Sequence, residues 1–93
     1  MIITLQNFEV FRKQRDYDIV KAELGEILYL LQCLNQELTN NKYRMSMQKK
    51  YILRSNIVET QKIATLYRTL VYDTERQLQV EVNKLNSFCL QIR

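Results

Sequence analysis

The chain of 93 residues contains no proline and a single glycine, Gly25. These two residue types normally set turns and end helices, so their scarcity leaves few places where the backbone can reverse. A chain of this length would ordinarily carry about four or five prolines and about six or seven glycines. We therefore predict an all-α protein built of long helices. The shortage of loops also argues against most enzyme folds, which carry their chemistry on loops.

Histidine is absent, and the two cysteines, Cys33 and Cys89, are not spaced as a ligand pair. There is no glycine-rich phosphate loop and no nucleophile beside a base. Asp16 and Asp18 lie two residues apart and so point to different helix faces. We expect no metal site, no cofactor and no enzymatic activity. Both cysteines fall among apolar residues, where core packing in a reducing, intracellular compartment is the expected state.

Long hydrophobic runs are also missing. The longest uninterrupted apolar run is Ile27–Leu31, which ends before Gln32. It is far shorter than the stretch of about 20 apolar residues needed to span a bilayer. The first six residues have no basic flank and no small-residue cleavage site, so they do not form a signal peptide pattern. We expect an intracellular, cytoplasmic protein without a transmembrane segment, in keeping with a cytoskeleton-associated role.

The first half of the chain carries a heptad repeat of apolar residues. Their spacings alternate between 3 and 4 over three heptads, which is typical of a coiled-coil seam. Gly25 lies just beside this seam, either as a tolerated exposed residue or as a point of close helix approach. The seam predicted to contact a partner helix comprises Tyr17, Val20, Leu24, Ile27, Leu31, Leu34 and Leu38.

The register falters after Leu38, at the turn-like cluster Thr39–Asn41, where asparagine can end a helix in the left-handed conformation. We predict one helical element over residues 1–93, with a first helix at about 4–38, a break at 39–42 and a second helix at about 43–92. A second apolar stripe drifts from a strict heptad. Its predicted seam comprises Ile63, Tyr67, Leu70, Leu78, Leu85, Phe88 and Ile92.

Two arrangements fit this pattern: a helical hairpin turning near 39–42, or a nearly continuous helical rod of about 140 Å. Residues 1–38 hold six acidic and four basic side chains, whereas residues 39–68 hold one acidic and seven basic. In a hairpin, Glu23, Glu26 and Glu37 would lie near the basic middle. In a rod, the basic residues of 39–68 would equally suit an acidic partner chain.

The basic patch of the middle segment combines cations with Tyr43 and Tyr51, as single-strand nucleic-acid sites do. Helical spacing spreads these cations around the axis, so a solvated face or a surface for an acidic protein is the favoured interpretation. The mixed apolar and basic positions also argue against binding to a membrane surface. The patch comprises Lys42, Arg44, Lys49, Lys50 and Arg54.

These patterns predict a structural scaffold protein that assembles with helical protein chains, as a homo- or hetero-oligomeric coiled coil. A cytoskeletal, ciliary, kinetochore or tethering complex is the kind of intracellular assembly that such a shape serves. The alternative is a basic helical module that binds nucleic acid or another polyanion.

Overall fold

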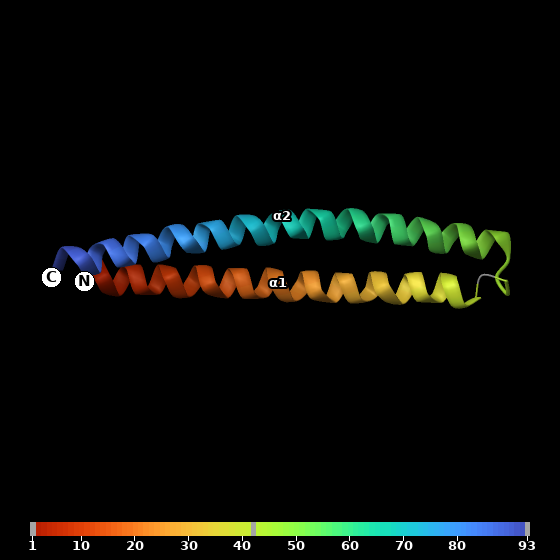
Figure 1. The fold of residues 1–93 in the computed structure, drawn as a ribbon, viewed down its shortest axis with the longest axis horizontal. Helices are drawn as coiled ribbons and strands as arrows, with labels where there is room; N and C mark the ends of the chain where they lie inside the picture. Colours follow the sequence, from red (N-terminus) through yellow and green to blue (C-terminus); the bar gives the residue numbers. More distant parts are fainter. Residues whose placement is uncertain (1, 42, 93) are drawn as a thin grey trace.

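A computed structural model describes the backbone of residues 2–41 and 43–92 and the side chains of residues 3–41 and 43–90. The chain forms two antiparallel helices, α1 (Ile2–Asn41) and α2 (Met47–Ile92), which lie side by side along their whole length (Figure 1). The molecule measures 69 × 15 × 15 Å. A continuous helix of the same length would be about 140 Å long, so the chain is a helical hairpin and not a rod.

The turn falls later than the predicted break at 39–42, because α1 continues through Thr39, Asn40 and Asn41. The side-chain amide of Asn41 donates to the Glu37 carbonyl (3.3 Å), and the Asn41 carbonyl accepts from the backbone N–H of Arg44 (2.9 Å). The second of these bonds uses a carbonyl group of the last turn, which the helix itself leaves unpaired. Thr39, Asn40 and Asn41 are all helical and have negative φ, so none of these three residues adopts the left-handed conformation.

Ser46 explains where α2 begins. Its hydroxyl accepts a hydrogen bond from the backbone N–H of Lys49 (3.2 Å), and its carbonyl accepts from the N–H of Lys50 (3.1 Å). This is the N-cap arrangement, in which a serine side chain satisfies a free amide of the first turn. The second helix therefore starts at Met47 and not at 43.

The two helices pack through what we call the contact seam, a stripe of half-buried or buried residues on each helix. The spacings alternate strictly between 3 and 4 on both helices, which is the pattern of a coiled coil. On α1 the contact seam comprises Ile3, Gln6, Val10, Lys13, Tyr17, Val20, Leu24, Ile27, Leu31, Leu34, Leu38 and Asn41. On α2 it comprises Lys50, Leu53, Ile57, Thr60, Ala64, Tyr67, Val71, Thr74, Leu78, Glu81, Leu85 and Phe88.

On α2 several contact-seam positions hold small or polar residues, so the heptad repeat of this helix is not recognisable from apolar residues in the sequence. Thr60 is buried, and its hydroxyl donates to the Asn56 carbonyl (2.7 Å). Thr74 bonds the Leu70 carbonyl in the same way (2.9 Å). Each threonine thus satisfies its own hydroxyl within α2, so it can occupy a core position without an unpaired polar atom. Ala64, only 2 % exposed, marks a close approach of the helices.

Gly25 and the two cysteines lie off the contact seam, and only the cysteines differ from the favoured sequence expectation. Gly25 is exposed, and no heavy atom lies within 4 Å of a β-carbon placed on it, so it is not a point of close helix approach. Cys33 is half-buried and Cys89 is exposed, and both are free thiols. Neither cysteine lies on the contact seam, so the core position predicted for them is wrong.

Candidate interaction surfaces

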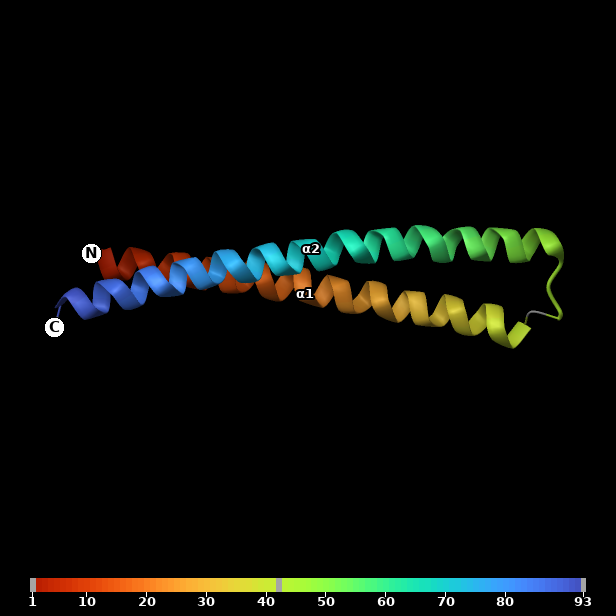
Figure 2. The same cartoon turned by 45° about the horizontal axis from the view of Figure 1, so that its top comes forward.

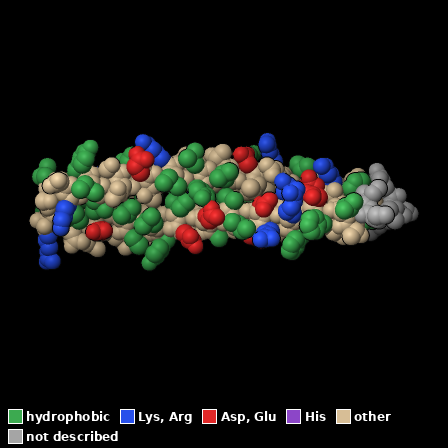
Figure 3. Space-filling model, turned by 180° about the vertical axis from the view of Figure 1, so that it is seen from behind, with side chains coloured by type: hydrophobic (Ala, Val, Ile, Leu, Met, Phe, Trp, Pro, Cys, Tyr) green, Lys and Arg blue, Asp and Glu red, His purple; other side chains and the backbone are tan. Residues whose placement is uncertain are grey.

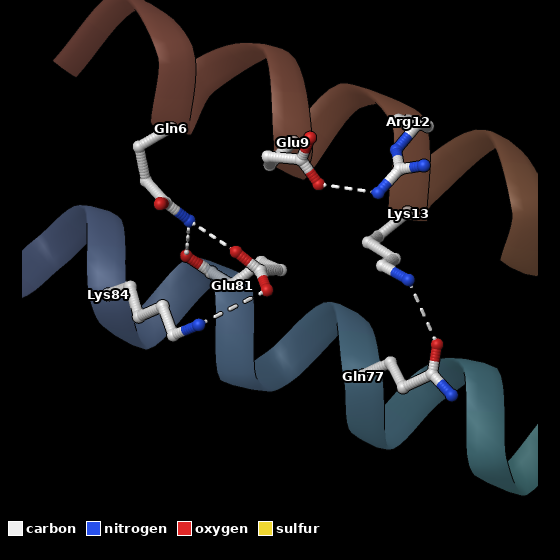
Figure 4. A network of polar contacts seen from close by, with 7 residues as sticks. All are labelled: Gln6, Glu9, Arg12, Lys13, Gln77, Glu81 and Lys84. Carbon is white, nitrogen blue, oxygen red and sulfur yellow. Dashed lines mark hydrogen bonds and ion pairs between the residues drawn. The ribbon is translucent and has the colours of Figure 1, made fainter. Parts of the chain in front are cut away.

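A polar layer joins the helices near their terminal end (Figure 4). The side-chain amide of Gln6 donates to both the backbone carbonyl (2.9 Å) and the carboxylate (2.6 Å) of Glu81. Further along α1, the Lys13 ammonium donates to the Gln77 side chain (3.1 Å). Gln6 and Glu81 both lie at core positions between the helices, so their pairing selects one register: a slip would leave these polar groups without partners.

The polar layer changes the protonation of Glu81. The hydrogen bond from Gln6 lowers the pKa of the Glu81 carboxyl, and the nearby Lys84 ammonium, at 3.5 Å, lowers it further. Partial burial of Glu81 acts in the opposite direction and is a smaller effect than the Gln6 hydrogen bond. The folded hairpin therefore favours the ionised form of this side chain.

Glu23 and Tyr67 make a second polar contact across the hairpin, in its middle. The nearby Glu23 carboxylate, as a hydrogen-bond acceptor and as a negative charge, raises the pKa of the Tyr67 hydroxyl. This contact places the side of α1 that carries Glu23 beside the α2 seam.

All seven residues of the first predicted seam, Tyr17 through Leu38, are half-buried and lie on the α1 contact seam. The partner facing them is α2 of the same chain. Stepping through the seam layers from the Gln6–Glu81 pair places Leu31 opposite Ile57 and Leu24 opposite Ala64. The hairpin therefore occupies the surface that the sequence pattern assigned to a partner helix.

The second predicted seam mixes two different stripes of α2. Tyr67, Leu78, Leu85 and Phe88 are half-buried on the contact seam. Ile63 and Leu70 are 45 % and 46 % exposed, and they lie outside the seam. The side chain of Ile92 falls outside what the structure describes. The predicted stripe departs from a strict heptad because it combines residues of the contact seam with Ile63 and Leu70, which lie on a different side of α2. Continuing the 3 and 4 spacing backward from Leu78 would have found the true seam.

The basic patch does not form one face. Arg44 and Lys49 line a groove of about 520 Å³ at the turn, together with Glu37. Lys50 is half-buried on the contact seam, Arg54 is exposed, and Lys42 lies outside the described residues. Within the described part of the chain, each ion pair joins residues of one helix, and none joins Glu23, Glu26 or Glu37 to this patch.

The hairpin leaves much apolar surface in contact with solvent. Among the described residues, only Leu53, Ile57 and Ala64 are buried hydrophobic residues, whereas seventeen large hydrophobic side chains are exposed. The accessible surface is 7489 Å², compared with about 5,700 Å² for a compact protein of this mass. The excess of about 1,800 Å² exceeds the roughly 800 Å² that each partner contributes to a standard interface.

Part of this apolar surface is ordered as a second heptad stripe on α2, which we call the outer stripe. It runs roughly 100° around α2 from the contact seam. Its centre is apolar: Ile63, Leu66 and Leu70 are 45 %, 66 % and 46 % exposed. The outer stripe comprises Ile52, Asn56, Glu59, Ile63, Leu66, Leu70, Asp73, Gln77 and Val80.

The α1 residues on the same side of the hairpin recur at every seventh position, and most are acidic. We call Glu9, Asp16, Glu23, Leu30 and Glu37 the acidic flank. The groove at the turn is lined by Glu37 from α1 and by Ile52 and Asn56 from α2, which shows that the acidic flank and the outer stripe share one side. Figure 3 shows a long face of the rod along which hydrophobic side chains are exposed, with both acidic and basic side chains among them.

Neither described helix has a stretch long and apolar enough to cross a membrane. Over the same residues, no three or more cysteine, aspartate or glutamate side chains gather as a group that could hold a metal ion. Comparison of the chain with protein-family models, with curated proteins and with solved structures gave no match.

Proposed function

We propose that this chain is a helical scaffold protein that takes its place in a larger intracellular assembly by packing against helical partner chains. The contact seam closes the hairpin, and the outer stripe of α2 receives the partner. One observation carries this proposal: Ile63, Leu66 and Leu70 form an exposed apolar stripe at coiled-coil spacing. Single exposed apolar residues are ordinary, whereas a contiguous exposed stripe indicates an interaction site.

A slender hairpin suits such a role because it offers length without bulk. With extents of 69 × 15 × 15 Å, almost every residue lies near the surface, and a third helix could lie along it for many turns. Cytoskeletal, ciliary, kinetochore and tethering complexes use elements of this shape, and cytoplasmic placement within one of them is part of the proposal.

Photo-crosslinking in cells tests the proposal directly. A photoreactive amino acid replaces Leu66, and a matched control carries it at Thr65, an exposed neighbour that lies off the outer stripe. We expect a discrete crosslinked species from position 66 and much less from position 65. Equal crosslinking from the two positions, or none from position 66, would reject the outer stripe as a docking surface. Salt-sensitive retention on nucleic acid, lost with Lys49 and Arg54 reversed, would favour the alternative of a polyanion-binding module.

A further inference from the structure

We infer that the outer stripe and the acidic flank together form a docking face for a basic amphipathic helix, one with an apolar stripe and lysine or arginine residues beside it. This inference rests on the proposed function, to which it adds the chemistry of the partner. It combines two independent features of one side of the hairpin: exposed apolar side chains on α2 and carboxylates on α1.

The apolar part of the face lies in the middle of the rod. Ile63, Leu66 and Leu70 follow one another at spacings of 3 and 4, and Leu30 of the acidic flank is 51 % exposed on the same side. In three-helix coiled coils, a third helix packs its side chains against both helices of a pair, on one side of their shared seam. The outer stripe of α2 and the acidic flank of α1 lie on one such side.

Carboxylates border this apolar centre. Asp16 and Glu23 belong to the acidic flank, Glu26 lies beside it, and Glu59 and Asp73 lie on the outer stripe. No cation occupies the α1 flank or the outer stripe between Asn56 and Gln77. Arg12 pairs with Glu9 of the acidic flank at 2.7 Å, and Lys62 pairs with Glu59 at 3.3 Å. No ion pair neutralises Asp16, Glu26 or Asp73 within the described part of the chain.

These charges decide between the available occupants. A second copy of the chain would set the same carboxylates against one another, and opposed like charges disfavour association. An acidic helix would meet the same repulsion. A helix with basic flanks would pair with the carboxylates while its apolar stripe covers Ile63, Leu66 and Leu70. The acids of this face stand out because the whole chain carries a net charge of +4.

A pair of designed peptides tests the inference with the intact chain. Both peptides carry leucine at the two seam positions of each heptad, and one has lysine and the other glutamate at the flanking positions. Fluorescence anisotropy measures binding of each labelled peptide. We expect the lysine peptide to bind, more weakly at higher salt, and the glutamate peptide to bind at least about 10-fold more weakly. Overall charge cannot explain this order, because a chain of net charge +4 repels a lysine-rich peptide.

Substitutions then locate the binding face. Leu66→Asp should weaken binding of the lysine peptide at least about 10-fold, whereas Thr65→Asp, which adds the same charge off the stripe, should not. Reversing three carboxylates (Asp16→Lys, Glu26→Lys and Asp73→Lys) should make the chain prefer the glutamate peptide. All of these positions are exposed or half-buried, and circular dichroism checks that each variant keeps its helix content.

Three results would overturn the inference: equal binding of the two peptides, no change of preference in the triple reversal, or a stable dimer without peptide that Leu66→Asp breaks. The last result would identify a second copy as the occupant. If the peptides fail while position 66 still crosslinks in cells, the partner chemistry is wrong and the proposed docking surface stands. If both fail, the proposed function fails as well.

Discussion

Gly25 is a helical glycine that makes no close contact with α2. It lies in the middle of α1, exposed, with open space around it. Glycine in a helix interior costs about 1 kcal/mol relative to alanine, because the unfolded chain has more freedom to lose. We expect Gly25→Ala to stabilise the hairpin by about 1 kcal/mol, measured by urea denaturation. Destabilisation would show that a close contact was present after all.

Glu81 should make the stability of the hairpin depend on pH. Its pKa is lowered in the folded state by the Gln6 hydrogen bond. The stabilisation is therefore present above the ordinary pKa of glutamate and is lost as the pH falls through the lower, folded value. We expect the melting temperature to fall on acidification below about pH 5, and less steeply in Glu81→Gln. Glu75→Gln, at an exposed position off the contact seam, serves as the control and should keep the wild-type profile.

At the scale of single elements, the N-cap of α2 depends on one hydroxyl. Ser46 accepts the Lys49 N–H, and replacing an N-cap serine by alanine costs about 1 kcal/mol. We expect Ser46→Ala to destabilise the hairpin by this amount in chemical denaturation. The matched change Ser55→Ala, at an exposed site within α2, should be neutral or slightly stabilising. Equal losses from both changes would mean that the cap contributes nothing.

A charged residue on the α1 contact seam should destabilise the hairpin far more than one beside the seam. Leu31 lies on the contact seam, whereas Gln32 is exposed beside it. A charge at position 31 would have to be buried against α2, so Leu31→Asp should cost about 2–4 kcal/mol and reduce helicity. Gln32→Asp should change the helicity little, as circular dichroism can measure. Similar losses from the two variants would contradict the register.

How far the elements could be predicted depended on their chemistry. The α1 seam was readable because its residues from Val20 through Leu38 are large and apolar. The α2 seam was not, since small or polar residues such as Thr60, Ala64 and Glu81 occupy core positions where periodicity searches look for large apolar residues. The more conspicuous Ile63 and Leu70 lie outside it. The turn lies a few residues later than the asparagines predict, because α1 continues through Asn41 and the Ser46 hydroxyl caps α2.

At the scale of the whole molecule, charge pattern alone could not separate hairpin from rod. The complementarity foreseen between Glu23, Glu26, Glu37 and the basic patch is not used in cross-helix ion pairs among the described residues. Apolar layers and the Gln6–Glu81 layer join the helices instead. The pairing of helices thus follows from which residues fill the seam, and exposed charges remain available for other contacts.

Solution scattering can check the overall dimensions. The hairpin has a Cα radius of gyration of 20.7 Å and a longest extent of 69 Å. We expect a maximum dimension close to that length at low concentration, with little change when the designed lysine peptide binds, because a third helix adds thickness and not length. A maximum dimension near about 140 Å would indicate an opened, rod-like chain.

The start of α1 and the end of α2 lie at the same tip of the rod, so the response of the hairpin to a pulling force depends on where the force is applied. The first turns of α1 and the last turns of α2 lie together, opposite the turn, and the two helices wind around each other between these ends (Figures 1 and 2). Tension applied between the two ends would load one layer of the seam at a time, starting beside Gln6 and Glu81, and the hairpin would unzip at low force. Tension applied along the outer face, through a helix bound there, would load many layers in shear. The same seam would then resist a far larger pull, so the direction of attachment would decide whether this hairpin yields or holds.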